Sequence, residues 1–97
     1  MPAVEALIQN KRGLHARAAA RFVKTADGFK ADISVCVTEP VEGGCAGGLQ
    51  VSGRSIMGLM MLAAGPGTVI RIEAEGEDAV ESIDALLALI NAKFDEE

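Results

Sequence analysis

The chain has 97 residues, 49% of them hydrophobic and 24% charged, so it is long enough for one core and lacks the composition typical of disorder. A net charge of -5 opposes binding to nucleic-acid phosphates, and three phenylalanines without tryptophan or tyrosine offer few rings for base stacking. No apolar run reaches the length of a membrane span and no basic leader is evident, so we expect one cytoplasmic domain over residues 1–97, without membrane insertion or nucleic-acid binding.

The first 28 residues predict a strand, a loop and a helix. Apolar alternation predicts a strand over residues 4–9. Its inward-facing residues are Val4, Ala6 and Ile8. Good helix formers predict a helix over residues 16–27, which ends at Gly28. The apolar face of this helix consists of Ala19, Phe22, Val23 and Ala26.

The only histidine, His15, lies where the loop becomes this helix. The first N–H groups of a helix have no intrahelical acceptor and carry the positive end of its dipole, so they favour an anion. Neutral imidazole has a free lone pair, and Arg17 can hydrogen-bond phosphate oxygens. These features favour a histidine that accepts a phosphoryl group, although a lone histidine near a turn is more often a solvated surface residue.

Residues 31–52 predict two strands joined by a loop. The strand over residues 31–38 directs Ile33, Val35 and Val37 inward and Cys36 to the face away from the helices. Four glycines and a proline over residues 39–48 indicate a turn or loop. The short strand over residues 49–52 directs Leu49 and Val51 inward.

The two cysteines, Cys36 and Cys45, could be bridged, but in a chain without an export signal we expect free thiols. A metal site that combined them with His15 would need further ligands, and none has suitable spacing. We therefore expect no metal site.

A second helix is predicted over residues 56–64, with Ser55 as its N-cap. Its buried face would consist of Ile56, Leu59, Met60 and Ala63. On so short a helix, Met57 and Met61 cannot all be buried together with the residues of that face, so some methionine must stay exposed. Exposed methionine suits a surface that docks several partners, and it is equally consistent with incomplete packing of a small domain.

The last third predicts a strand and a long helix. Residues 68–75 alternate clearly, with Ile70, Ile72 and Ala74 on one face. A helix follows to about residue 92, with Glu77, Asp78 and Glu81 near its start and Lys93 at its end, as the helix dipole favours. Its buried face would consist of Val80, Ile83, Leu87 and Ile90, broadened by Leu86 and Leu89. The whole order is βαββαβα, which predicts an α+β fold: a two-layer open-faced sandwich in which three helices cover one face of a four-stranded sheet.

Two motifs give the chain a resemblance to HPr, the histidine phosphocarrier of the bacterial phosphotransferase system: GLHAR at residues 13–17 and SIMG at residues 55–58. Residues 10–11 and 94–97 are similar to proteobacterial members, including the nitrogen-related branch. The resemblance implies an antiparallel sheet of order 1-4-2-3, with His15 and Ser55 near one surface.

The resemblance also implies a function. In HPr the imidazole Nδ1 accepts a phosphoryl group from enzyme I, which phosphoenolpyruvate has phosphorylated, and passes it to a histidine of enzyme IIA. We therefore expect His15 to carry the group, Arg17 to steady it, and the protein to be a monomeric carrier without cofactor rather than an enzyme. The expected docking surface consists of Ala16, Ala20, Met57 and Met60.

Ser55 matches the serine that an HPr kinase/phosphorylase modifies in some members of the family. Its simpler interpretation is an N-cap alone. The sequence does not establish whether such a kinase acts on it, nor whether the pathway served is sugar uptake or nitrogen-related regulation.

Two features depart from the family pattern. Ala18 replaces the usual proline after the arginine, which is expected to loosen the first turn by about 0.5–1 kcal/mol. The loop over residues 39–48 is longer than the usual hairpin, and it suggests no function. A regulatory module read through its phosphorylation state, or a generic sandwich domain with an incidental His15, are the alternatives to a carrier.

Overall fold

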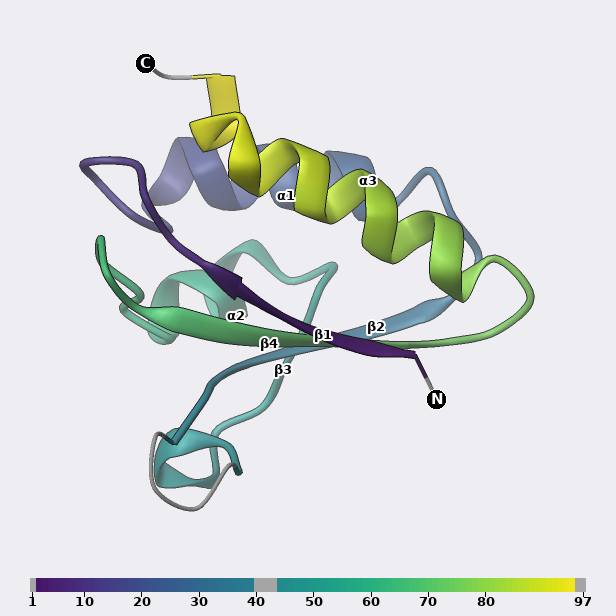
Figure 1. Ribbon diagram of the computed structural model, residues 1–97, viewed down its shortest axis with the longest axis horizontal. Coiled ribbons are helices and arrows are strands. Elements are labelled where there is room, and N and C mark those ends of the chain that lie inside the picture. Colours follow the sequence, from purple (N-terminus) through teal and green to yellow (C-terminus); the bar gives the residue numbers. More distant parts are fainter. Residues whose placement is uncertain (1, 40–43, 96–97) are drawn as a thin grey trace.

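Four short strands with alternating burial form the sheet of this protein (Figure 1). The computed structural model describes residues 2–39 and 44–95. The strands are β1 (Ala3–Leu7), β2 (Asp32–Val37), β3 (Val51–Ser52) and β4 (Val69–Glu75). They lie in the order β1-β4-β2-β3, and every neighbouring pair is antiparallel. The expected strand order is confirmed.

Three helices cover one face of this sheet: α1 (Ala16–Ala26), α2 (Ile56–Met61) and α3 (Ala79–Asn91). Two 3-10 turns, η1 (Ala46–Gly48) and η2 (Lys93–Asp95), complete the described elements. A single core contains side chains from all three helices and from the inward face of the sheet. Its largest fully buried members are Phe22, Phe94, Ile8, Leu59, Ile70, Ile72, Leu86 and Ile90. The other face of the sheet is open, so the predicted open-faced sandwich is confirmed.

Helix α2 buries less than its sequence predicted. It ends at Met61, and within it only Leu59 is buried. Ile56 and Met60, which we expected in the core, are 41% and 40% exposed, and Ala63 is also exposed. The reason is length: a helix of six residues has fewer than two turns with which to contact the core.

Two further residues that we expected to be buried in the core are exposed to solvent. Leu49 precedes β3 rather than belonging to it and is 37% exposed. Val80 is 56% exposed, because α3 packs through a face rotated from the predicted one. That face consists of Ala79, Ser82, Ile83, Leu86 and Ile90. Ala79 and Ser82 are buried at the start of the helix, where the Ser82 hydroxyl donates to Ala79 O at 2.7 Å, and Val80 between them faces solvent.

Cys36 and Cys45 form a disulfide bond, with Cα atoms 5.4 Å apart, so the prediction of free thiols was wrong. Backbone pairing brings the two together: Thr38 and Cys45 form an antiparallel bridge, and Glu39 N–H donates to Gly44 O at 2.6 Å. The absence of an export signal bears on the cellular compartment, whereas this local pairing places the two sulfur atoms within bonding distance. Residues 40–43 of the predicted loop lie outside the described residues.

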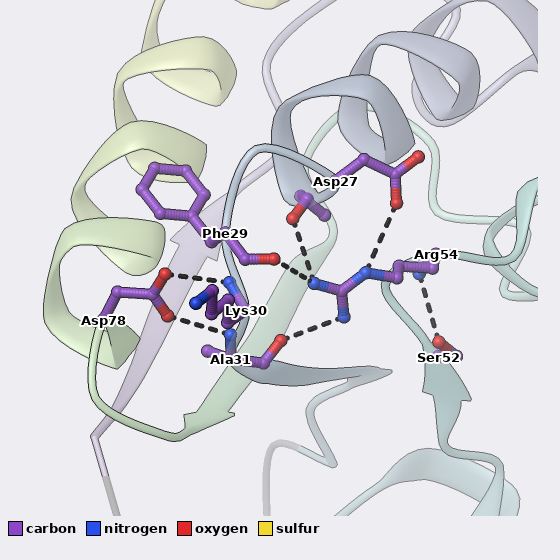
Figure 2. Close-up of polar contacts among 8 residues, drawn as sticks. Asp27, Phe29, Lys30, Ala31, Ser52, Arg54 and Asp78 are labelled. Atoms are coloured by element: carbon purple, nitrogen blue, oxygen red, sulfur yellow. Dashed lines mark hydrogen bonds and ion pairs between the residues drawn. The ribbon is translucent and has the colours of Figure 1, made fainter.

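The side chain of Arg54 binds the end of α1 from the segment before α2 (Figure 2). Its Nη2 donates to Ala26 O at 3.2 Å and Phe29 O at 2.6 Å, and its Nη1 donates to Ala31 O at 2.9 Å. Its Nε also lies 3.3 Å from Asp27 Oδ1. A single guanidinium therefore satisfies carbonyls at and beyond the C-terminus of α1, where the helix dipole favours a cation.

Asp78 binds the backbone between α1 and β2 from the side opposite Arg54 (Figure 2). It is the N-cap residue of α3, but its carboxylate accepts hydrogen bonds from Lys30 N–H and Ala31 N–H, each at 2.8 Å, and not from its own helix. The hydrogen bond from Lys30 N–H, helped by that from Ala31 and by the charge of Lys30, lowers the pKa of Asp78 below its ordinary value of 3.8. This carboxylate thus links α3 to the start of β2.

A left-handed turn at Gly13 shapes the loop before α1. Gly13 has φ +61°, and a Cβ at this position would collide with Ala64 O. Gly13 N–H donates to Asn10 O at 3.1 Å, the fully buried Asn10 Nδ2 donates to Gly13 O at 2.9 Å, and Leu14 N–H donates to Ala64 O at 2.9 Å. The loop is therefore closed on itself and tied to the chain that follows α2.

Replacing Asp78 with asparagine is predicted to destabilise the protein in a pH-dependent way. A carboxylate whose pKa is lowered on folding stabilises the native state above the ordinary pKa of 3.8, and this stabilisation is lost as the pH falls through the lowered value. The difference in free energy of unfolding between wild type and Asp78→Asn should be largest near neutral pH and shrink below 3.8. Urea denaturation at several pH values measures it. Asp84→Asn, on the exposed face of α3, is the control; a difference for Asp78→Asn that does not change with pH would contradict the assignment.

Substituting Gly13 with alanine is predicted to lower the free energy of unfolding by about 2 to 4 kcal/mol, because the new Cβ meets Ala64 O and the residue is held at positive φ. Gly65→Ala is the matched control, since a Cβ there would have no neighbouring atom within 4 Å and its φ is not in the left-handed region. Denaturant melts of both variants provide the comparison. Equal losses of stability would show that the turn at Gly13 tolerates a side chain.

Candidate functional site

His15 is the N-cap residue of α1, as the sequence predicted. Its backbone is extended, with φ -76° and ψ -179°, and its carbonyl accepts the first helical hydrogen bond from Ala19 N–H at 2.8 Å. The side chain is half-buried and does not cap the helix itself. The imidazole is thus held at the opening turn and is not enclosed in the core.

The first turn of α1 is favourable for an anion beside His15. The turn contains no acidic residue, so no carboxylate neutralises the positive end of the helix dipole. Arg17 lies exposed in this turn and makes no ion pair within the described part of the chain. Its guanidinium is available to a negatively charged group carried at the start of the helix.

Ala18 is fully buried and packs in the core with Ala19 and Phe22. It occupies the position at which the family that this chain resembles usually has proline. Leu14, on the other side of His15, is also buried at 4% exposure. The half-buried His15 is therefore flanked by residues that anchor the chain in the core. This packing limits the looseness that the missing proline would allow.

Ser55 caps α2, as predicted. Its Oγ accepts a hydrogen bond from Gly58 N–H at 2.9 Å, and the residue is half-buried. The guanidinium of its neighbour Arg54 binds carbonyl groups at and beyond the end of α1 (Figure 2). The hydroxyl of Ser55 therefore has a structural role whether or not it is ever modified.

Exposed apolar side chains gather on α2. Met57 is 70% exposed, Met61 65%, Ile56 41% and Met60 40%. Ala16 and Ala20 are exposed on α1, which packs against α2. The sequence indicated that Met57 and Met61 could not all be buried, and Met57 and Met60 were expected in a docking surface. It did not indicate that Ile56 would be exposed beside them.

The loop before α1 and helix α2 lie at the same end of the molecule (Figure 1), and the hydrogen bond between Leu14 N–H and Ala64 O joins them. The structure therefore brings the elements that carry His15 and Ser55 to one region. Among the residues that the structure describes, no three side chains of histidine, cysteine, aspartate or glutamate are grouped to hold a metal ion. No helix in residues 2–39 and 44–95 has the length and hydropathy to span a membrane.

This arrangement can transiently hold a phosphoryl group. A half-buried imidazole supplies the nucleophile, and the helix N-terminus and Arg17 can stabilise the charge electrostatically. Such a site contains few catalytic groups of its own, which suits a protein that hands the group between partners.

Comparisons with known proteins agree with this chemistry. Residues 3–92 match the family model described as "PTS HPr component phosphorylation site". The phosphocarrier protein HPr of Pseudomonas aeruginosa is 47% identical over 96 residues, which cover 99% of this chain and 98% of that protein. The phosphocarrier protein NPr of Shewanella violacea is 40% identical over 89 residues, covering 92% and 88% of the two chains.

Solved structures show the same fold. The crystal structure of HPr-C-His from Thermoanaerobacter tengcongensis is 44% identical in sequence, with a TM-score of 0.84 over 100% of this chain and 99% of that one. A phosphocarrier protein HPr from Bacillus anthracis is 39% identical, with a TM-score of 0.76 over 92% and 95% of the two chains. This chain therefore belongs to the HPr family, the phosphocarrier proteins of the phosphotransferase system, which are carriers rather than enzymes.

Proposed function

We propose that His15 accepts a phosphoryl group from phosphorylated enzyme I, in a relay driven by phosphoenolpyruvate, and passes it to enzyme IIA. The observation that supports this most directly is the position of His15 as the half-buried N-cap of α1, before a turn without acidic residues. In a generic sandwich domain with an incidental histidine, there would be no reason for the histidine to lie at a helix N-terminus that lacks acidic residues.

The transfer forms a bond between phosphorus and the imidazole Nδ1 while the bond between phosphorus and its donor atom on enzyme I breaks. The electron pair of the broken bond leaves with the donor atom. The N–H groups at the start of α1 and the guanidinium of Arg17 then stabilise the negative charge on the phosphoryl oxygens. Because these groups are few and partly solvated, the phosphoryl group remains transferable.

The exposed apolar face of α2, with Ala16 and Ala20, is the proposed docking surface for both partners. Met57 and Met60 supply flexible thioether side chains, which adapt to differently shaped surfaces. We also propose that the protein acts as a monomer, because this surface must be open to enzyme I and enzyme IIA in turn.

Ser55 is a proposed site of regulation by an HPr kinase/phosphorylase. Phosphate there would add up to about two negative charges beside the apolar face of α2. At the N-cap it would be favoured by the helix end, yet it would repel an acidic partner. The half-buried hydroxyl, already bonded to Gly58 N–H, would have to be presented to the kinase.

Replacing His15 with alanine is predicted to abolish labelling from radioactive phosphoenolpyruvate in the presence of enzyme I, because the accepting nitrogen is lost. Lys24→Ala, which removes an exposed cation from the far part of α1, should retain labelling. Incorporation of label, together with circular dichroism of both variants, provides the measurement. Full labelling of folded His15→Ala would show that the carrier function does not depend on this residue.

Incubation with ATP and an HPr kinase is predicted to label wild type but not Ser55→Ala. Ser52→Ala, which changes a nearby exposed serine, should be labelled like wild type. Ser55→Ala should also lose about 1 kcal/mol of stability through the missing cap, so a thermal melt must establish that it is folded. Equal labelling of wild type and Ser55→Ala would exclude Ser55 as the modified residue.

A further inference from the structure

We infer that the Cys36–Cys45 pair is a reversible thiol–disulfide exchange site that reacts with low-molecular-weight thiols and disulfides of the glutathione class. The pair lies on the open face of the sheet and its loop, away from the core that supports His15. Nothing in the phosphocarrier function uses it.

The two cysteines have different surroundings. Cys36 is fixed in β2, which pairs with β3 on one side and β4 on the other, and only 1% of the residue is exposed. Cys45 lies on the connecting segment, is half-buried, and follows the exposed Gly44. An external thiolate therefore reaches the sulfur of Cys45, and Cys36 becomes the leaving group.

The sheet register places a cation beside the leaving sulfur. Arg71 in β4 is the direct cross-strand partner of Cys36, and the two side chains share the open face. Directly opposed residues have Cβ atoms about 4.5–5.5 Å apart. A neighbouring guanidinium favours the thiolate over the thiol, which makes Cys36 a better leaving group. The Nε of Arg71 also contacts Glu73 Oε1 at 3.1 Å, and Glu5 is its partner in β1, so these carboxylates moderate the effect without removing the cation.

The chemistry balances as a two-electron exchange. A glutathione thiolate attacks Cys45 Sγ, forming a mixed disulfide, and Cys36 leaves as a thiolate. A second glutathione thiolate then attacks the glutathione sulfur of the mixed disulfide and releases Cys45. Two glutathione molecules are thereby oxidised to glutathione disulfide and the protein disulfide is reduced to two thiols; the reverse steps restore the bridge.

The fold does not depend on the bridge. Cys36 is buried, yet it does not belong to the core cluster that unites the helices with the inward face of the sheet. The ladder between β2 and β4 runs from Asp32 to Val37 and is formed by backbone pairing, in which the sulfur atoms take no part. Reduction therefore releases Cys45 while the sandwich remains folded.

The test is a redox titration of the full chain. The protein is equilibrated in buffers of varied ratio of glutathione to glutathione disulfide and quenched with acid. It is then labelled with N-ethylmaleimide in denaturant, so that the buried Cys36 is also accessible, and its mass is measured by mass spectrometry. We expect a reversible change from no label to two labels, with unchanged far-ultraviolet circular dichroism. Two labels at every ratio, or no label at any ratio at which circular dichroism shows the protein to be folded before the quench, would overturn the proposal.

Two variants test the mechanism. Arg71→Gln should slow reduction by glutathione about three- to tenfold relative to wild type, whereas Lys24→Gln, a cation on α1, should leave the rate unchanged. Cys45→Ser should form no internal bridge and carry one label in reducing buffers. An unchanged rate for a folded Arg71→Gln would overturn the assigned role of Arg71.

Discussion

The left-handed turn at Gly13 is the constraint on which the placement of His15 depends. It lets Leu14 N–H reach Ala64 O, and the buried amide of Asn10 closes the loop from within. Leu14 then enters the core immediately before His15, so the next residue can only stand at the start of α1. His15 thus gains its position from a hydrogen-bonded loop and from the buried Leu14 that precedes it.

The C-terminal end of α1 is also held by side chains from other segments. Arg54 binds the carbonyls of Ala26 and Phe29, and Asp78 holds the N–H groups of Lys30 and Ala31 (Figure 2). Charges of both signs thereby satisfy the backbone where α1 turns into β2. With both ends of the helix tied to neighbouring segments, the direction of its dipole, and hence the anion-favouring region at His15, is set by the fold.

Sequence patterns predicted the strands, the helices and the place of His15 at the start of α1, because each of these depends on local periodicity or on a motif. The sequence patterns gave wrong or missing predictions where contacts between distant segments determine the structure. Val80 fits an apolar helical stripe, but α3 buries the face that contains Ala79, Ser82 and Ile83, which leaves Val80 exposed. Pairing of Thr38 with Cys45 creates the disulfide, and no local pattern indicated that Arg54 would bind residues more than twenty positions earlier.

The replacement of the family's usual proline by Ala18 has two opposing effects at the site. Alanine allows more conformations to the unfolded chain, which lowers stability, but complete burial of Ala18 holds the folded turn in one conformation. Alanine also retains a backbone N–H, which proline lacks, at a position in the first turn where no intrahelical acceptor exists. The start of α1 in this chain therefore presents one more donor to an anion on His15, while the closed Gly13 loop and the buried side chains on either side supply the rigidity that proline would have provided.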